Sequence, residues 1–374
     1  MIAVPRTDRS VLGRWWWTVD RWTLIALSIL IAFGALMAFA ASPSVASRIR
    51  IDSLSLVKHH FALLPVAGVL LLGVSLLDVR NVRRLAVLGF VAGCLLLGLT
   101  LVAGTEIKGA SRWISLGGFS LQPSEFVKPC FAVVAAWMFS LQHGPERIPG
   151  NLIAMVLFAP VLGLLLLQPD LGMAVVIAAT FLAQFFLAGL PIFWVGLLGG
   201  LAVAGMVGAY FAFPHVQQRV DAFLDPASGD RYQIDRSLEA FANGGWFGRG
   251  PGEGTVKLVL PDAHSDFVFS VVGEEFGTVV ALFIVAVFCF VILRGIARLM
   301  NEQNLFVLLA AAGLLVSFGL QAAINMASSL SLIPTKGMTL PFISYGGSSL
   351  LALSLTMGML LGLTRKRPGR GGFA

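Results

Sequence analysis

Long apolar runs constrain the fold of this 374-residue chain more than any other feature of its sequence. Hydrophobic residues make up 57% and charged residues 12% of the chain, against about 25% charge in ordinary soluble domains. Runs of roughly 17–25 residues, the length that crosses about 30 Å of hydrocarbon, recur along it. We find ten, at about 23–41, 61–77, 85–103, 126–142, 151–168, 171–189, 192–213, 267–293, 305–325 and 345–363. The sequence therefore predicts an all-α polytopic membrane protein with ten transmembrane helices.

Basic residues predict which side of the membrane each segment faces. An even number of crossings places both termini on one side. The termini and the loops on that side hold 14 of the 26 Lys and Arg residues, although their combined length is less than that of the loops on the other side. By the positive-inside rule, both termini are expected in the cytoplasm. The net charge of +7 then reflects membrane topology, so nucleic-acid binding is not expected.

This topology divides the chain into three parts. Residues 1–22 form a cytoplasmic N-terminal segment, residues 23–363 form the ten-helix transmembrane domain, and residues 364–374 form a basic cytoplasmic tail. The tryptophans at 15–17 are expected at the membrane interface. A large extracytoplasmic loop, residues 214–266, separates helices 7 and 8. It contains aromatic residues and a glycine-rich turn region, and a loop this long with its own structure is usually functional.

Asp266 is the most informative polar residue. It lies in Leu260-Pro-Asp-Ala-His-Ser-Asp-Phe-Val-Phe269, where the long polar loop ends and an apolar helix begins. An acid at the edge of a bilayer costs up to roughly 2.5–3.5 kcal/mol, so such a residue usually marks a functional site. The alternative is an Asp that caps the following helix, which is an ordinary role at a helix start.

Three further outward-facing segments carry polar residues. Glu125 and Lys128 lie three residues apart at the start of the fourth helix, so they either form an intrahelical ion pair or position a substrate. Gln168-Pro-Asp-Leu-Gly172 reads as a tight turn. The segment from Pro334 to Ser349 is rich in Pro and Gly, which suits a broken, re-entrant stretch surrounded by protein or a watery cavity. Glu274 and Glu275, inside the eighth helix, are expected either to pair with Lys or Arg across the bundle or to line the site, and a structural role is favoured.

Together, one acid and several cations are expected at the outer mouth of a helical bundle. Arg and Lys would hold a pyrophosphate, and the carboxylate would take a proton from a sugar hydroxyl. The chain has no HExxH, no GxxxxGK[ST] and no GxGxxG after a strand, so ATP is not expected as an energy source. This chemistry suits an anionic, lipid-linked substrate.

Five ordered stretches carry a family resemblance: KGASRWISLGGFSLQPSEFVK, QPDLG, YQIDRSLEAFANGGWFGRGPGEG, LPDAHSDFVFSVVGEEFG and PTKGMTLPFISYGGSS. They resemble the SEDS family (shape, elongation, division and sporulation) of bacterial membrane proteins over nearly the whole chain after residue 20. GPGEG and PTKG are similar to the cell-division members, whereas elongation members more often carry a PVTG-like sequence in place of PTKG.

The resemblance implies a peptidoglycan glycosyltransferase that polymerises lipid II outside the bacterial inner membrane, at the division septum. It implies a class B penicillin-binding protein (an FtsI-like transpeptidase) and other divisome proteins as partners. Asp266 falls on the family's proposed catalytic acid, and Arg112, Lys128 and Lys336 fall on its cations. The departures are Lys108, Ser111 and Ser265. The full expected substrate-binding set is Arg112, Trp113, Glu125, Lys128, Arg249, Lys257, His264, Lys336 and Ser344.

Other functions fit the same composition. A flippase that moves lipid II between leaflets would also have many helices and broken segments, but its substrate groups should lie near the midplane. A scaffold that recruits the crosslinking enzyme would leave the clustered charge unexplained, and an elongation-type polymerase is the alternative within the family. No cofactor is certain, and Mg²⁺ or Mn²⁺ is the one that a pyrophosphate substrate would suggest.

Overall fold

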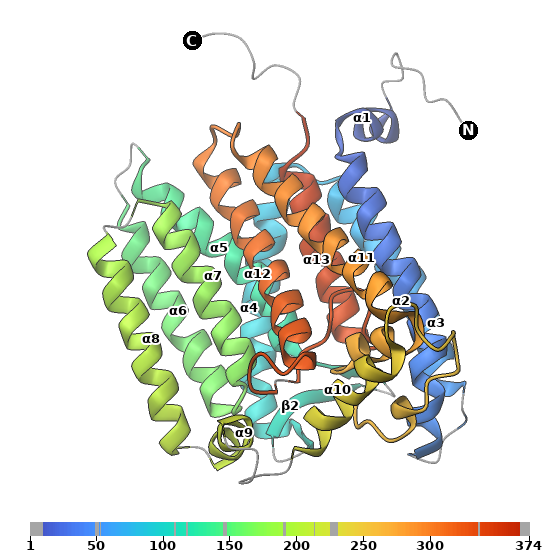
Figure 1. Cartoon of the computed structure of the whole chain (residues 1–374). Helices are drawn as coiled ribbons and strands as arrows, with labels where there is room; N and C mark the ends of the chain where they lie inside the picture. Colours follow the sequence, from blue (N-terminus) through green and yellow to red (C-terminus); the bar gives the residue numbers. More distant parts are fainter. Residues whose placement is uncertain are drawn as a thin grey trace.

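A computed structural model shows a bundle of long helices (Figure 1). It describes residues 10–48, 52, 54–107, 110–116, 119–144, 148–189, 192–212, 214–224, 231–335 and 337–366. Each of the ten apolar runs coincides with one helix. These helices are α2 (Arg21–Arg48), α3 (Ser55–Ser75), α4 (Val79–Ala103), α5 (Pro123–Gln142), α6 (Gly150–Leu167), α7 (Leu171–Leu187), α8 (Ile192–Ala212), α11 (Val268–Leu299), α12 (Leu305–Ser329) and α13 (Gly347–Leu363).

Length and apolar composition are sufficient for membrane crossing in seven of these helices: α2, α3, α4, α5, α6, α11 and α12. The apolar parts of α7, α8 and α13 are shorter. The expectation of a polytopic helical membrane protein is confirmed. A count of ten crossings stays a prediction.

The two ends of the bundle carry different elements. The short helix α1 (Val11–Thr18) and the C-terminal end of α13 lie at one end, which we call the α1 end (Figure 1). The strand β2 and the helices α9 (Pro214–Leu224) and α10 (Tyr232–Gly244) lie at the opposite end, the α10 end. The segments next to the two termini therefore share one end, as an even number of crossings requires.

The centre of the bundle is formed by α5 and α12. About 78% of the most apolar window of α5 and 72% of that of α12 are buried, against 22–44% for the outer helices. Phenylalanines fill the space between α5, α6 and α7, with the rings of Phe158 and Phe181 stacked at 4.5 Å and those of Phe139 and Phe185 at 4.8 Å. Both helices are therefore buried on most sides, and the polar side chains that they carry at this centre pair with each other, as Lys128 of α5 does with Gln321 of α12.

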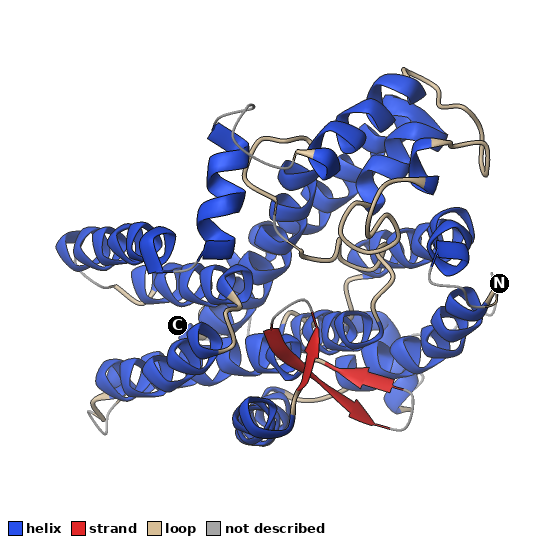
Figure 2. Ribbon diagram, turned by 90° about the horizontal axis from the view of Figure 1, so that it is seen from below, coloured by secondary structure: helices blue, strands red, loops and turns tan. Residues whose placement is uncertain are grey.

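A small antiparallel sheet crosses the α10 end and is the one departure from an all-α fold among the described residues. Its strands are β1 (Thr105–Ile107), β2 (Ala110–Leu116) and β3 (Phe119–Leu121), in the order β1-β2-β3. Ile114 of β2 pairs with Leu121 of β3. Figure 2, seen from this end, shows the strands lying across the bundle. Pairing continues to Leu116 and Phe119, so β2 and β3 run side by side over the whole length of β3.

The expected outer loop, residues 214–266, has structure of its own. It holds α9, α10 and the short 3₁₀ helix η1 (Val256–Leu258). The α10 helix packs on α11, where Ser237 contacts Ser270 with 2.6 Å between hydroxyl oxygens and donates to the backbone oxygen of Ser329 at 2.5 Å. Gly248 has φ of +81° and lies so close to Glu275 that a Cβ would be 2.2 Å from its carbonyl oxygen. Only glycine fits this turn.

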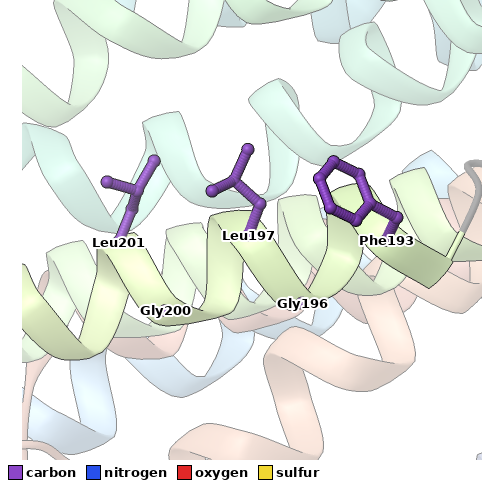
Figure 3. A pocket seen from close by; sticks show the side chains of 5 residues that line it. All are labelled: Phe193, Gly196, Leu197, Gly200 and Leu201. Atoms are coloured by element: carbon purple, nitrogen blue, oxygen red, sulfur yellow. The ribbon is translucent and has the colours of Figure 1, made fainter.

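An open hollow lies on α8, at the edge of the bundle. Phe193, Gly196, Leu197, Gly200 and Leu201 line a cavity of about 540 Å³, and Figure 3 shows the three larger side chains on one face of the helix. This lining supplies neither charge nor a side-chain hydrogen-bond donor. A binding site normally places a few polar groups among apolar ones, so the candidate active site must lie elsewhere.

Candidate active site

Asp266 lies in the turn that leads into α11. Its backbone N–H donates to the carbonyl oxygen of Asp262 at 3.0 Å, and its side chain is half-buried. The N-cap position of α11 belongs to Phe267, so Asp266 lies outside the capping position. A Cβ built on Gly337 would be 2.9 Å from Oδ2 of Asp266. The carboxylate therefore lies directly beside the backbone of the 334–346 segment.

Asn325 of α12 holds these two segments together. Its Nδ2 donates to the carbonyl oxygen of Asp266 at 2.8 Å and to that of Met338 at 2.6 Å. The side chain is fully buried. Because buried carbonyls need donors, one amide group satisfies both backbones and fixes their spacing.

Ser344, an expected substrate-binding residue, makes a second link. Its hydroxyl donates to the carbonyl oxygen of Ser265 at 2.5 Å and accepts from the N–H of Leu340 at 2.8 Å. The Ser344 side chain is buried, so its contacts in this structure are to the backbone. Its geometry supports a role in holding the neighbour of Asp266 in place.

His264 contributes to an aromatic stack beside the same turn. Its ring lies 5.1 Å from the ring of Tyr345, and the Tyr345 N–H donates to the His264 carbonyl at 2.9 Å. On the other side, the ring of His60 from α3 lies 5.9 Å from that of Tyr345. Sequence reasoning missed His60, which lies beside an apolar run more than 200 residues away.

Glu125 and Lys128 form the expected intrahelical ion pair, with 2.9 Å between Nζ and Oε2. Both side chains are buried, and the ammonium also donates to Oε1 of Gln321. Gln321 in turn donates from Nε2 to the carbonyl and the hydroxyl of Thr339, each at 3.1 Å. The pair therefore supports the 334–346 segment from within the bundle. Leaving either charge alone at this depth would be strongly unfavourable.

Arg112 of β2 binds the QPDLG turn. Its Nε donates to the carbonyl of Gln168 at 3.1 Å, Nη2 donates to that of Pro169, and Nη1 lies 3.8 Å from Asp170. Burial raises the pKa of the Asp170 carboxyl, and the charge of Arg112 opposes that shift only in part. Trp113, the next residue in β2, is half-buried. Arg112 thus connects two motifs that look independent in the sequence.

Lys257 lies in η1, directly after the glycine-rich turn region (residues 243–254), and its side chain is buried. It donates to the carbonyls of Ala40 and Gly252, each at 3.0 Å, and forms an ion pair with Glu275. These contacts turn the side chain away from solvent and give the ammonium a supporting role in this structure, while its expected role in substrate binding stays a prediction. Of the two glutamates, Glu275 thus has a lysine partner, which comes from the outer loop and not from another helix of the bundle.

Glu274 organises the same region by accepting backbone hydrogen bonds. Oε1 accepts from Thr255 at 2.7 Å and Val256 at 2.8 Å, and Oε2 accepts from Lys257 at 3.2 Å. A fully buried carboxylate is stabilised by several such donors. The two acids thus shape the turn region, as the expectation of a structural role requires.

The remaining cations are Arg249, Lys336 and Arg48. Arg249 is exposed, and its Nε donates to the carbonyl of Asn243 at 3.2 Å. Lys336 lies outside the described residues, between Thr335 and Gly337. Arg48, at the end of α2, was not singled out in the sequence, yet its Nη1 donates to the carbonyl of Leu260 at 2.8 Å. That contact puts an additional cation on the turn that holds Asp266.

The described residues contain no group of three or more His, Cys, Asp and Glu side chains arranged to hold a metal ion. What the site does hold is one half-buried carboxylate, two segments locked together around it, and arginines at its margin. This arrangement can accept a proton from a bound hydroxyl and can meet negative charge on a leaving group.

The fold and this site define a polytopic helical membrane protein with a polar site at one end of the bundle. Residues 20–368 match the family model of the FtsW/RodA/SpoVE cell cycle proteins, and the chain belongs to that family. It is 48% identical to a probable peptidoglycan glycosyltransferase FtsW of Caulobacter vibrioides over 98% of this chain and 94% of the relative. The protein of the same name from Coxiella burnetii is 37% identical over 92% and 96%.

Two solved structures share the fold. One, described as "Structural coordination of polymerization and crosslinking by a peptidoglycan synthase complex", has a TM-score of 0.75 and 29% identity, and the match covers 92% of this chain and 97% of that one. The other is the rod shape determining protein RodA of Thermus thermophilus, with a TM-score of 0.70, 28% identity and coverage of 93% and 97%.

Proposed function

We propose that this chain is a peptidoglycan glycosyltransferase that polymerises lipid II into glycan strands at the outer face of the bacterial cytoplasmic membrane during cell division. Eight curated relatives at 34–48% identity are named probable peptidoglycan glycosyltransferase FtsW, whereas the solved RodA structure is 28% identical. Within the chain, the observation that carries the proposal is Asp266 beside Gly337, at one end of the bundle.

In the proposed reaction, the 4-hydroxyl of the GlcNAc of lipid II attacks C1 of the MurNAc at the end of a lipid-linked strand. The new bond joins O4 to C1 as the bond from C1 to the pyrophosphate oxygen breaks, and Asp266 takes the hydroxyl proton. General base catalysis of this kind is worth about 10²–10⁴-fold. A single carboxylate fits direct displacement with inversion, because a retaining mechanism needs a second one as nucleophile.

Undecaprenyl pyrophosphate leaves with the bonding electrons, and cations stabilise its developing charge. Arg249, on the exposed turn region, and Arg48, on the Asp266 turn, are suitably located candidates. Lys336 follows Thr335 in the segment that contacts Asp266. Mg²⁺ or Mn²⁺ would add positive charge to the pyrophosphate when bound, with phosphate oxygens as its main ligands.

The proposal extends to partners and location. A class B penicillin-binding protein, an FtsI-like transpeptidase, would crosslink the product, and other divisome proteins would bring both to the septum. The likeness to a chain from a peptidoglycan synthase complex supports such a partner. The excess of basic residues on the side of the termini supports an α1 end in the cytoplasm and an α10 end outside.

A lipid II flippase is the main competing function. A transporter needs substrate groups near the midplane that open to both sides. Here Asp266 leads into the end of α11 on which α10 packs, with Phe241 against Phe269, and the ion pair of Glu125 and Lys128 is closed off by burial. This placement favours a polymerase.

The test is strand synthesis from purified lipid II, with the chain reconstituted beside its class B penicillin-binding protein. Asp266→Asn should lower the rate by about 10²–10⁴-fold, because the amide cannot accept the proton. Asp262→Asn is the matched control, four residues away in the same turn, where Asn tolerates the φ of +52°. It should retain activity.

Two results would count against the proposal. If a folded, partner-bound Asp266→Asn variant still makes glycan, the assignment of Asp266 as the base is wrong, although the chain is still a polymerase. Failure of the wild-type complex to make glycan, together with movement of lipid II across the vesicle membrane, would favour the flippase.

A further inference from the structure

The α11 helix is interrupted at Gly277, where φ is +81° and ψ is 176°. A continuous helix would direct the N–H groups of Thr278 and Val279 to carbonyls four residues earlier in α11. Here they donate instead to the carbonyls of Gly245 at 2.9 Å and Trp246 at 3.2 Å. These acceptors belong to the loop that follows α10.

The two carbonyls of α11 that lose these donors are paired with the same loop. The Glu274 carbonyl accepts from the N–H of Arg249 and the Glu275 carbonyl accepts from that of Gly250, each at 3.0 Å. A Cβ on Gly277 would lie 2.4 Å from a backbone nitrogen of the loop, so only glycine allows this close approach. The loop is thus inserted by its backbone into the break in α11.

The break lies at membrane depth by two measures. Arg294 of α11 forms an ion pair with Asp20, directly before α2, at 3.0 Å, which marks the charged boundary at the α1 end. Gly277 precedes Arg294 by 17 residues, or about 25 Å of helix. The ring of Phe276 lies 5.6 Å from that of Phe33, which is 12 residues, or about 18 Å, beyond the start of α2. Both lengths fall within the roughly 30 Å of hydrocarbon.

Two large side chains of this inserted loop, residues 245–250, face outward at that depth. Trp246 is 68% exposed and Phe247 is 86% exposed. Residues of α11 that follow the break are exposed too, with Val279 at 47% and Leu282 at 57%. Because α11 is long and apolar enough to cross a membrane, its outer side contacts lipid, and the two loop side chains extend that surface. Figure 1 shows the loop after α10 beside α2 and α11 and not beyond the end of the bundle.

The rest of the inserted loop suits a lipid environment. Backbone groups in hydrocarbon must be paired within the protein, and the N–H groups of Gly248, Arg249 and Gly250 all donate to carbonyls. Arg249 is the one charged residue of the loop. Its Nε donates to the carbonyl of Asn243, and the long stem of an arginine can lie in hydrocarbon while its charge stays at the headgroups.

We propose that Trp246 and Phe247 insert among the acyl chains of the bilayer, in the half nearer the α10 end. The inserted loop is a wedge held by α11 on one side and by lipid on the other, so this part of the expected outer loop lies in the membrane. Bilayer lipid is the occupant that also covers the continuous apolar side of α11. The inference does not depend on the proposed reaction.

The test places one nitroxide label at a time on the full chain in phosphatidylcholine liposomes. Cys94 and Cys289 are first replaced by alanine, and Cys130, which is fully buried, is left in place. Labels are attached to Trp246→Cys or Phe247→Cys. Collision of the label with oxygen, which concentrates in hydrocarbon, is compared with its collision with a polar nickel chelate, which hydrocarbon excludes at least about tenfold.

Two reference positions calibrate the ratio of oxygen to nickel collisions. Leu282→Cys, on the exposed side of α11, reports hydrocarbon. Asp52→Cys reports water, because the Asp52 side chain is 60% exposed in the segment between α2 and α3. The ratio at positions 246 and 247 should match that at position 282 and exceed that at position 52 at least about tenfold.

Two results would overturn the proposal. A ratio at positions 246 and 247 equal to that at position 52 would place the inserted loop in water. Low collision with both reagents would show that a second copy of the chain covers the two side chains. Each labelled chain is required to keep the unfolding temperature of its unlabelled parent, and because the two positions are read separately, one misfolded variant leaves the other to decide.

Discussion

The buried ammonium of Lys257 allows a direct test of whether this cation serves the fold or the substrate. It donates to Gly252, Ala40 and Glu275, and Oε2 of Glu275 accepts from the N–H of Gly252 at 3.0 Å. The Lys257 side chain is 8% exposed and that of Glu275 is 0% exposed, so water screens the pair little. Lys257→Met keeps most of the side-chain volume and removes the charge.

The expected cost follows from what the substitution leaves behind. Glu275 would remain as a buried carboxylate without its cation, and removing one partner of a buried ion pair costs about 3–5 kcal/mol. In the double variant Lys257→Met/Glu275→Gln no buried charge remains at this pair. Only the hydrogen bonds to the two carbonyls are lost, at about 1–3 kcal/mol. The double variant should therefore be more stable than the single one.

The free energy of unfolding can be followed by titrating the purified chain with SDS in detergent micelles. Lys58→Met is the matched control, because its ion pair with Asp52 is largely exposed, and its stability should equal that of the wild type. The KM for lipid II of the folded fraction should be unchanged in Lys257→Met. A stability loss below about 1 kcal/mol together with a raised KM would refute the structural assignment and restore Lys257 as a substrate cation.

Three other perturbations test the site and the α1 end. Gly337→Ala should push against the Asp266 carboxylate and lower kcat by up to about 10²-fold with little change in unfolding temperature, measured by strand synthesis and thermal unfolding. Asn325→Leu should leave two buried carbonyls without their donor and cost about 1–3 kcal/mol per unsatisfied group, measured by SDS titration. Burial alone would raise the pKa of Asp20, but hydrogen bonds and charge from two arginines of α11 hold it below 3.8. The stability that Asp20 contributes is thus present above about pH 5 and lost as pH falls through that lowered pKa. The difference in the free energy of unfolding between wild type and Asp20→Asn should therefore shrink below pH 3.8.

Features that depend on residues close in sequence were predictable. The apolar runs all form helices, because every backbone polar group in a membrane must be paired within its own segment. The three-residue spacing of Glu125 and Lys128 predicted their ion pair, and the aromatic content of residues 214–266 indicated a structured loop. The family motifs placed Asp266 at the candidate site.

Contacts between distant residues were not predictable. The three acceptors of the Lys257 ammonium come from α2, the glycine-rich turn and α11, and Arg112 binds a turn 56 residues away. His60 reaches the Tyr345 ring from a helix that reads as plain membrane span. Each of these side chains could contact many different partners in a folded chain. The packing of the helices decides which partner it contacts.

The sequence by itself determined the class of protein, the helices, the family and the acid at the centre of the proposed chemistry, since all of these follow from local composition and short motifs. Only the tertiary structure decided which cations are buried supports and which remain exposed. The charge of a side chain follows from its residue type, whereas its burial and its partners depend on which helices lie side by side.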